Sequence, residues 1–204
     1  MLFPQDVLNF WFGPNGPINL KNAKPIWFEC TEQDDEEIRK KFLTTYDLAT
    51  AGELDKNKER SDGCLALIVT LDQFPRHIFR GSPKSFESDE QALSYARWAI
   101  EKRFDEIYPP LARVFIYLPF EHSENLHDQQ RCVELMHALP DYSYKSENIR
   151  FASRHLEIIE RFGRFPHRNE ILGRESTQEE LVFLKEPDSS FIWPKSWNRN
   201  ESVR

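Results

Sequence analysis

Helical periodicity dominates this chain and limits the folds that are open to it. Apolar residues in the long segments recur at three- and four-residue spacing, and only seven glycines occur in 204 residues. Such spacing puts the apolar side chains on one face of an α-helix, whereas half-buried strands alternate apolar and polar residues. Residues 65–69 and 114–120 are apolar all round, which is typical of helices buried inside a protein. The sequence therefore predicts an all-α fold of about seven or eight helices.

Capping signals mark where these helices begin and end. Ser88 with Gln91 and Ser176 with Glu179 have the spacing of a capping box, in which two side chains satisfy two free backbone N–H groups. Helices are also expected to begin at the hydroxyl residues Thr31, Ser61 and Ser123, and to end at Gly52, Pro140 and Gly163.

Length and composition indicate one domain. A chain of 204 residues with 16 Phe and 5 Trp has enough apolar area for a sizeable core without a disulfide or metal. The helical pattern stops near Pro187. We therefore expect a single domain over residues 1–186 and an irregular tail over residues 187–204.

Charge and cysteine usage exclude several classes of protein. A net charge of −7 disfavours sequence-independent binding to nucleic acid, and no apolar run approaches the ~20 residues that span a membrane. The N-terminus lacks the basic and small-residue pattern of a signal peptide. Three cysteines lie far apart, with no CxxC pair, which predicts reduced thiols and a cytoplasmic location.

Common catalytic motifs are missing from the sequence. It contains no GxGxxG, P-loop, GxSxG or HExxH pattern, and no pair of residues has the local spacing of a zinc site. The cysteines have no obvious base beside them in the sequence, so nucleophilic cysteine chemistry is not indicated. We expect neither a metal nor a cofactor.

Polar residues instead gather beside buried helices in three segments. Asp72 and Asp128 lie on apolar stripes and are expected to point inward, Asp72 toward a partner such as Arg76 or Arg80. His155 interrupts another apolar stripe. The candidate ligand-binding residues are Asp72, Arg76, Arg80, Glu121, His122, Glu124, Asp128, His155, Arg161, Arg164, His167 and Arg168.

A short internal similarity links two of these segments. Residues 73–77 read QFPRH and residues 164–168 read RFPHR, each after an apolar helix. Proline ends or redirects a helix, so the basic residues of both segments are expected at helix junctions. We expect Arg164, His167 and Arg168 to reach a cleft without being needed for the core.

The same segments resemble a known family. The resemblance rests on DVLNFWFG at residues 6–13, LDQFPRHIFRG at 71–81, LPFEHSE at 118–124 and RFGRFPHRN at 161–169, together with WF at 27–28, DQ at 128–129 and LGREST at 172–177. These motifs resemble the bacterial domain-of-unknown-function family number 924, and the resemblance covers roughly residues 6–184. It implies a tetratricopeptide-like bundle of antiparallel helix pairs and brings no established reaction. His77 stands where the family pattern leads us to expect asparagine.

Three interpretations of the polar segments remain open. The first is a binding protein that takes an anionic small molecule or peptide group in a cleft rich in Arg and His, since six arginines face only three acids between Arg150 and Arg174. The second is a hydrolase or lyase in which Glu121, Glu124 or Asp128 works beside His155 or His167, with arginines stabilising negative charge. In the third, the charges form a purely structural network of ion pairs.

Overall fold

The computed structural model describes residues 2–20, 22–27, 30–187 and 189–190, and these residues form helices and turns with no strand among them. The predicted all-α fold is therefore confirmed. The α-helices are α1 (Gln5–Phe12), α2 (Glu32–Thr50), α3 (Ser61–Ile68), α4 (Phe74–Ile78), α5 (Asp89–Glu101), α6 (Pro110–His122), α7 (Leu126–Ala138), α8 (Lys145–Phe162) and α9 (Gln178–Phe183).

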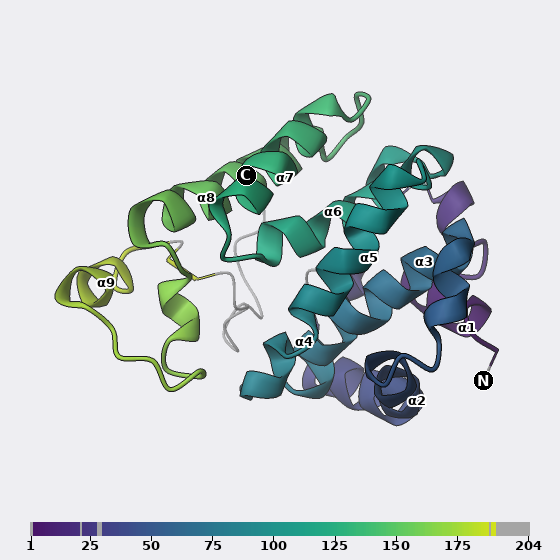
Figure 1. Ribbon diagram of the computed structural model, residues 1–204, viewed down its shortest axis with the longest axis horizontal. Coiled ribbons are helices and arrows are strands. Elements are labelled where there is room, and N and C mark those ends of the chain that lie inside the picture. Colours follow the sequence, from purple (N-terminus) through teal and green to yellow (C-terminus); the bar gives the residue numbers. More distant parts are fainter. Residues whose placement is uncertain (1, 21, 28–29, 188, 191–204) are drawn as a thin grey trace, which may run out of the picture.

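The longer helices pack against their neighbours in chain order. Helix α3 lies against α5, α5 against α6, α6 against α7, and α7 against α8, so that the chain crosses the molecule step by step (Figure 1). Helix α2 packs on α4, and α1 packs on α3. The tetratricopeptide-like description of this arrangement stays a prediction.

Two hydrophobic cores hold these helices together. The larger core joins α1 to α7 and contains the fully buried Trp11, Phe42 and Phe74. The smaller core consists of Ile158, Ile159, Phe165 and Phe183, from α8, the segment after it and α9. Helix α8 belongs to both, because its Ala152 packs in the larger core.

The helix that begins at α3 does not continue regularly. A π-helical turn, η4 (Val69–Gln73), follows Ile68 and leads directly into α4. Pro75 explains part of this distortion, because it has no N–H to donate to the carbonyl of Leu71 four residues earlier. The Ser88 hydroxyl donates to that carbonyl at 2.6 Å instead. Single π-helical turns often occur at functional sites.

Ser88 was expected to cap α5, and it does not. Ser88 is the N-cap residue by position, but its side chain makes no capping hydrogen bond because it is used on Leu71. Two other predicted caps are displaced along the chain. Asn125, not Ser123, caps α7, and the last capping box consists of Thr177 and Glu180.

The cap at Thr31 and the end of α8 agree with the sequence. Thr31 accepts from the Asp34 N–H and Asp34 reaches back to the Thr31 N–H, so α2 begins with a full capping box. Gly163 ends α8 in the left-handed conformation that glycine adopts without strain.

No helix in the described part of the chain is long and apolar enough to cross a membrane. The irregular tail was predicted over residues 187–204, and most of it, residue 188 and residues 191–204, lies outside the described residues.

The contact of α3 with the 3₁₀ turn Asp55–Glu59 yields a first prediction. A Cβ atom on Gly63 would lie 2.2 Å from the Asn57 carbonyl oxygen, which is backbone and cannot move aside alone. Gly63→Ala is therefore expected to lower the free energy of unfolding by about 1–3 kcal/mol, measured by urea denaturation. Gln33→Ala, on an exposed turn of α2, should change it by less than about 0.5 kcal/mol. Equal effects of the two substitutions would contradict this packing.

Candidate functional site

Asp72 occupies the centre of the buried polar residues. It lies in the π-helical turn η4 and is completely buried, as its place on the apolar stripe predicts. Its Oδ1 is 2.7 Å from His122 Nδ1 and 3.7 Å from Arg76 Nη1, and the Gln73 amide donates to Oδ2. Burial alone would raise the pKa of Asp72, but the charge of Arg76 and the hydrogen bonds from His122 and Gln73 hold it below its ordinary value. Asp72 is therefore an anion at neutral pH.

A second carboxylate, Asp89, joins two arginines from distant parts of the chain. Arg76 on α4 donates to both oxygens of Asp89, at 2.9 and 3.1 Å. Arg168 donates to Asp89 Oδ2 at 3.5 Å, across 79 positions of sequence. Arg76 and Arg168 come from the two similar segments FPRH and FPHR. The fold therefore places the arginine of each segment beside the same carboxylate, Asp89. The charges alternate from Asp72 through Arg76 and Asp89 to Arg168.

Arg168 is buried, which corrects the expectation that it stands free of the core. Its side chain is only 8% exposed, because its guanidinium lies 4.6 Å from the ring centres of both Phe86 and Phe165. Burial lowers the pKa of Arg168 to about 10, and the nearby Asp89 charge acts in the opposite direction. The guanidinium therefore remains charged at neutral pH, and its Nε is buried without a hydrogen-bond partner.

A pocket opens beside these charges and is called the central pocket below. Its volume is about 450 Å³. Helices α5 and α6, the turn before α5 and the segment around Arg168 supply its walls. The lining residues are Pro83, Phe86, Glu87, Asp89, Glu90, Leu93, Pro119, His122, Ser123, Glu124, Arg168 and Leu172.

His122 connects the buried Asp72 with this pocket. Its Nδ1 contacts Asp72, its side chain is 15% exposed, and no described residue hydrogen-bonds its Nε2. Burial and the charge of Arg76 lower the pKa of His122, against the opposing effect of Asp72. The ring is therefore neutral at neutral pH, with the Nδ1 proton donated to Asp72 and a lone pair on Nε2.

Glu124 and Arg174 fix the wall of the central pocket that carries Arg168. Arg174 donates to both oxygens of Glu124, at 2.7 and 3.0 Å. Glu124 also accepts from the Phe165 N–H at 2.8 Å, and Arg174 donates to the Phe165 carbonyl. The predicted site residue Glu124 thus holds the backbone just ahead of Arg168.

The predicted pair Glu121 and His155 is brought together, but away from the pocket. Their closest side-chain atoms are 3.4 Å apart, and both side chains are 7% exposed. Burial and the charge of Asp72 raise the pKa of Glu121 to about 8, and burial lowers the pKa of His155 well below its usual value. At neutral pH both groups are therefore mostly uncharged, so the contact is a buried polar contact rather than an ion pair.

The other candidate residues lie outside the central pocket. Asp128 is buried as predicted, but its partners are Arg97 and Ser123, at 2.7 and 2.9 Å. Arg161 pairs with Glu179 and Arg164 with Glu180, so these two arginines attach α9. His167 packs on the ring of Phe165.

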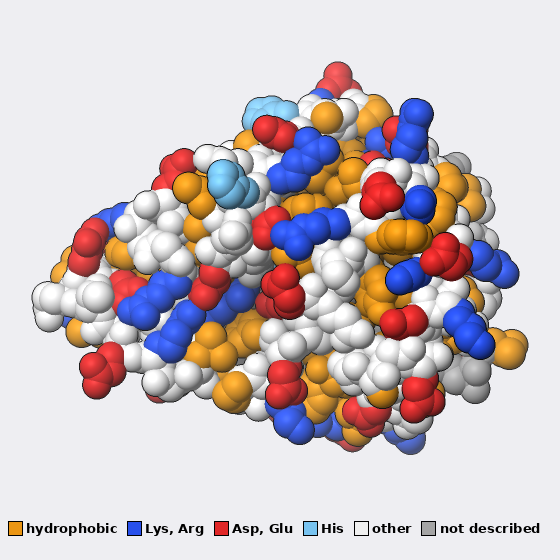
Figure 2. Space-filling view, viewed as in Figure 1, with side chains coloured by type: hydrophobic (Ala, Val, Ile, Leu, Met, Phe, Trp, Pro, Cys, Tyr) orange, Lys and Arg blue, Asp and Glu red, His pale blue; other side chains and the backbone are white. Residues whose placement is uncertain are grey.

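Arg80 is likewise not a partner of Asp72, since it pairs with Asp35 on α2. Of the five candidate arginines, Arg168 lines the central pocket and Arg76 joins it through Asp89, whereas Arg80, Arg161 and Arg164 pair with acids elsewhere. Figure 2 agrees with this pattern, since acidic side chains lie among the basic ones over the α8–α9 part of the visible face.

Several residues of this site were missed in the sequence. Asp89, Phe86 and Arg174 carried no signal beyond an acidic first turn, an apolar ring and a basic stretch. They belong to the site because of contacts with residues far away in the sequence, and only the folded structure shows these contacts.

A separate cluster lies near the start of α2. Cys30, Asp35 and His77 place possible metal-ligating atoms within 4.8 Å of one another. Arg80 donates to both Cys30 and Asp35, so a cationic guanidinium already lies among these atoms. The expected absence of a resident metal stays a prediction.

The fold and this site define an all-α protein with a buried network of alternating charges beside a small pocket. Residues 7–188 match the family described as "Bacterial protein of unknown function (DUF924)", and the chain belongs to that family. It is also similar to a solved structure of a protein of unknown function from Agrobacterium tumefaciens, with 37% sequence identity and a TM-score of 0.77. That match covers 88% of this chain and 95% of the other. A search of curated proteins finds no match.

The buried carboxyl of Glu121 gives a prediction for the pH dependence of stability. Its pKa is raised in the folded protein from the ordinary 4.5 to about 8, so the folded state holds a proton that the unfolded state has lost. Its contribution to stability is therefore complete below about pH 4.5 and is lost as the pH rises to about 8. Glu121→Gln stays neutral and should become more stable relative to the parent by about 2–4 kcal/mol across this window.

Urea denaturation at several pH values measures this difference. Glu134→Gln, on the exposed face of α7, is the matched control and should follow the parent at every pH. A Glu121→Gln curve parallel to that of the parent would contradict the buried neutral carboxyl.

Proposed function

We propose that the central pocket binds a small molecule through a carboxylate or phosphate group, and that Arg168 is the residue that binds this group. The observation that carries the proposal is the state of the Arg168 side chain. Its described hydrogen bond is a single long one, 3.5 Å to Asp89, and its Nε has no partner. A guanidinium has five N–H donors in a planar fork, so most of its donor capacity is left for a ligand.

The surroundings of Arg168 favour tight binding of such a group. Phe86 and Phe165 hold the guanidinium in one plane, and Glu124 with Arg174 holds the backbone before it. A fork already fixed in place loses little conformational entropy when it binds a planar or tetrahedral anion. Charge-assisted hydrogen bonds of this kind are about twice as strong as neutral ones.

The rest of the central pocket limits what the ligand can be. Its volume of about 450 Å³ suits a metabolite, and Phe86, Leu93 and Leu172 offer apolar contacts to the body of the molecule. Glu87 and Glu90 also line it. These carboxylates would repel a molecule with several negative charges, so we favour a ligand with one anionic group and a neutral or cationic remainder.

A thermal-shift screen of small carboxylates and phosphate monoesters tests this proposal. A compound that binds the native state raises the melting temperature, and its Kd follows from titration. Arg168→Lys keeps the charge and loses the planar fork, so we expect about tenfold or more weaker binding. Because Arg168 is buried, the same change should also lower the free energy of unfolding by about 1–3 kcal/mol.

Arg161→Lys is the matched control, since Arg161 forms an exposed pair with Glu179 and does not line the central pocket. It should leave the affinity unchanged. An affinity that is equal in Arg168→Lys and the parent would overturn the role of Arg168.

Acid–base catalysis is a second candidate function, favoured by the pair of Asp72 and His122. A buried carboxylate that holds the Nδ1–H of a neutral imidazole leaves Nε2 as a base toward the pocket. Arg168 on the same pocket could stabilise negative charge that develops on a bound substrate. In this hypothesis the protein is a hydrolase or lyase with His122 as the general base, in place of the carboxylate and histidine pairs expected from the sequence.

His122→Asn separates this candidate from simple binding. The Asn amide N–H2 can still donate to Asp72, but nothing replaces Nε2. Compounds that bind in the screen are incubated with the parent, and their conversion is followed by mass spectrometry. We expect His122→Asn to bind them with similar affinity and to lose about a hundredfold or more in turnover. If the parent converts none of them, or if the variant is as active as the parent, the catalytic hypothesis fails while the binding site stands.

The location and further partners of the protein are also proposals. We propose that it works in the cytoplasm, since its three cysteines are free and its family is bacterial. The net charge of −7 supports the absence of a nucleic-acid partner, and the absence of a membrane partner stays a prediction.

A further inference from the structure

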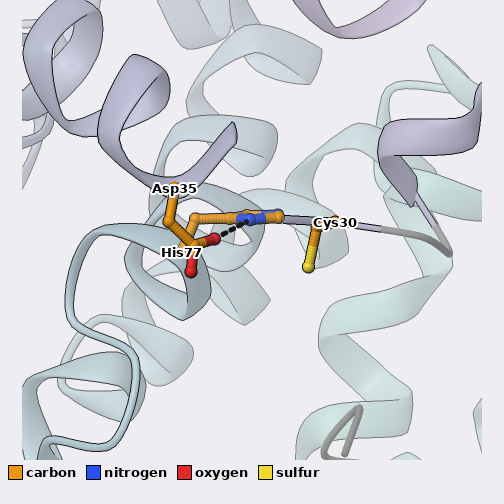
Figure 3. A group of neighbouring side chains, drawn as sticks. All are labelled: Cys30, Asp35 and His77. Atoms are coloured by element: carbon orange, nitrogen blue, oxygen red, sulfur yellow. Dashed lines mark hydrogen bonds and ion pairs between the residues drawn. The ribbon is translucent and has the colours of Figure 1, made fainter. Parts of the chain in front are cut away.

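Cys30, the residue before the N-cap of α2, lies among three polar side chains that do not touch the central pocket. Arg80 Nη2 donates to its sulfur at 2.9 Å and to Asp35 Oδ1 at 2.7 Å. Asp35 Oδ1 is also 2.9 Å from His77 Nδ1. In Figure 3 the imidazole of His77 extends from beside Asp35 toward Cys30. In this cluster the imidazole of His77 lies between the carboxylate of Asp35 and the thiol of Cys30, and the guanidinium of Arg80 contacts both of these groups.

This order is the one that activates a thiol. A carboxylate that binds one nitrogen of an imidazole orients the ring and favours its protonated form, which stabilises a neighbouring thiolate. The adjacent guanidinium adds a second positive charge. The sequence had given Cys30 no base, because Asp35 and His77 are 42 positions apart and meet only where α2 packs on α4.

The pKa directions agree with the geometry. The hydrogen bond with His77 lowers the pKa of the Cys30 thiol most, the charges of Arg80 and His77 add to this, and burial and Asp35 act against it. The pKa of His77 is raised, because hydrogen bonds with Asp35 and Cys30 outweigh its burial. Asp35 keeps its negative charge, since Arg80 and His77 lower its pKa against the effect of burial.

The other two cysteines offer an internal contrast. Cys64 and Cys132 are completely buried, whereas Cys30 is half-buried. Burial raises the pKa of Cys64 to about 12 and also raises that of Cys132. Neither belongs to the groups around Cys30, so nothing in the described part of the chain supplies a second thiol for an internal disulfide.

We propose that Cys30 is a site of reversible S-thiolation, at which its thiolate exchanges with a low-molecular-weight disulfide. In this step the Cys30 sulfur attacks one sulfur of the small disulfide along the S–S axis. A new S–S bond forms between Cys30 and that sulfur as the original S–S bond breaks. The second sulfur leaves with the bonding electron pair and takes a proton from water. Cys30 is oxidised, half of the disulfide is released as a reduced thiol, and a free thiol reverses the step.

Reaction of the native full-length chain with oxidised glutathione, and with a neutral aromatic disulfide as a second probe, tests this proposal. Mass spectrometry of the digested protein gives the rate at each cysteine separately. At about pH 6 we expect Cys30 to react about fivefold or more faster in the native protein than in the urea-unfolded chain, with Cys64 and Cys132 protected in the native state. Two probes are used because Arg80 could attract a charged disulfide without activating the thiol.

Substitution of His77 tests the mechanism. His77→Gln keeps a side chain that can bind Asp35 but cannot carry a positive charge, and it should remove most of the native rate enhancement, leaving only the effect of the Arg80 charge. Cys30→Ser is the control, and it should abolish the fast reaction with both probes. If His77→Gln fails to fold, the dependence of the native rate on pH decides. A midpoint below that of the unfolded chain supports the proposal, and an equal midpoint overturns it.

Three results would overturn the proposal. The first is a native Cys30 that reacts no faster than the unfolded one with either probe. The second is thiolation confined to Cys64 or Cys132. The third is a His77→Gln variant that folds and reacts as fast as the parent. None of these results bears on the binding site at Arg168.

Discussion

The burial of the Asp72 carboxylate is the interaction on which the rest of this molecule depends. A carboxylate with no exposed surface is costly to keep charged, and removal of a partner from such a site typically costs about 3–5 kcal/mol. Three groups offset this cost by contacting Asp72: the Gln73 amide in the same turn, Arg76 one helical turn later and His122 at the end of α6. The requirement to keep this charge paired therefore fixes how η4, α4 and α6 meet. It also decides which nitrogen of His122 is left for the pocket.

The same requirement explains why arginines are held so rigidly in an acidic protein. Arg76 compensates Asp72 and is itself compensated by Asp89, and Asp89 in turn faces Arg168. These two carboxylates and two guanidinium groups carry no net charge together. A neutral network of this kind can be buried between two hydrophobic cores, whereas an isolated arginine could not. Its last member, Arg168, has the fewest partners, and this imbalance is what points to a ligand.

Much of the fold follows from local sequence, and the site does not. Apolar stripes at helical spacing correctly predicted the all-α fold and the burial of Asp72 and Asp128. This was possible because the face on which a helical side chain lies is set by its position within that helix alone. Helix α1 and the true caps at Asn125 and Thr177 were missed, because short segments and neighbouring Ser, Thr and Asn residues give nearly equal local signals. The partners of Arg80, Arg164 and Arg168 lie 16 to 79 positions away, and only packing selects among the many acids of this chain. For the same reason, only two of the five candidate arginines, Arg76 and Arg168, belong to the network of Asp72 and Asp89.

The π-helical turn η4 has a consequence that reaches beyond Asp72. Each residue added to a helix rotates everything after it by about 100°. Helix α4 follows η4 directly, and its neighbouring residues Arg76 and His77 face different partners, Asp89 on one side and Asp35 on the other. Loss of one residue from η4 would turn both side chains away at once. The central pocket and the cysteine cluster therefore depend on the same helical register, and a change in the backbone of one would disturb the other.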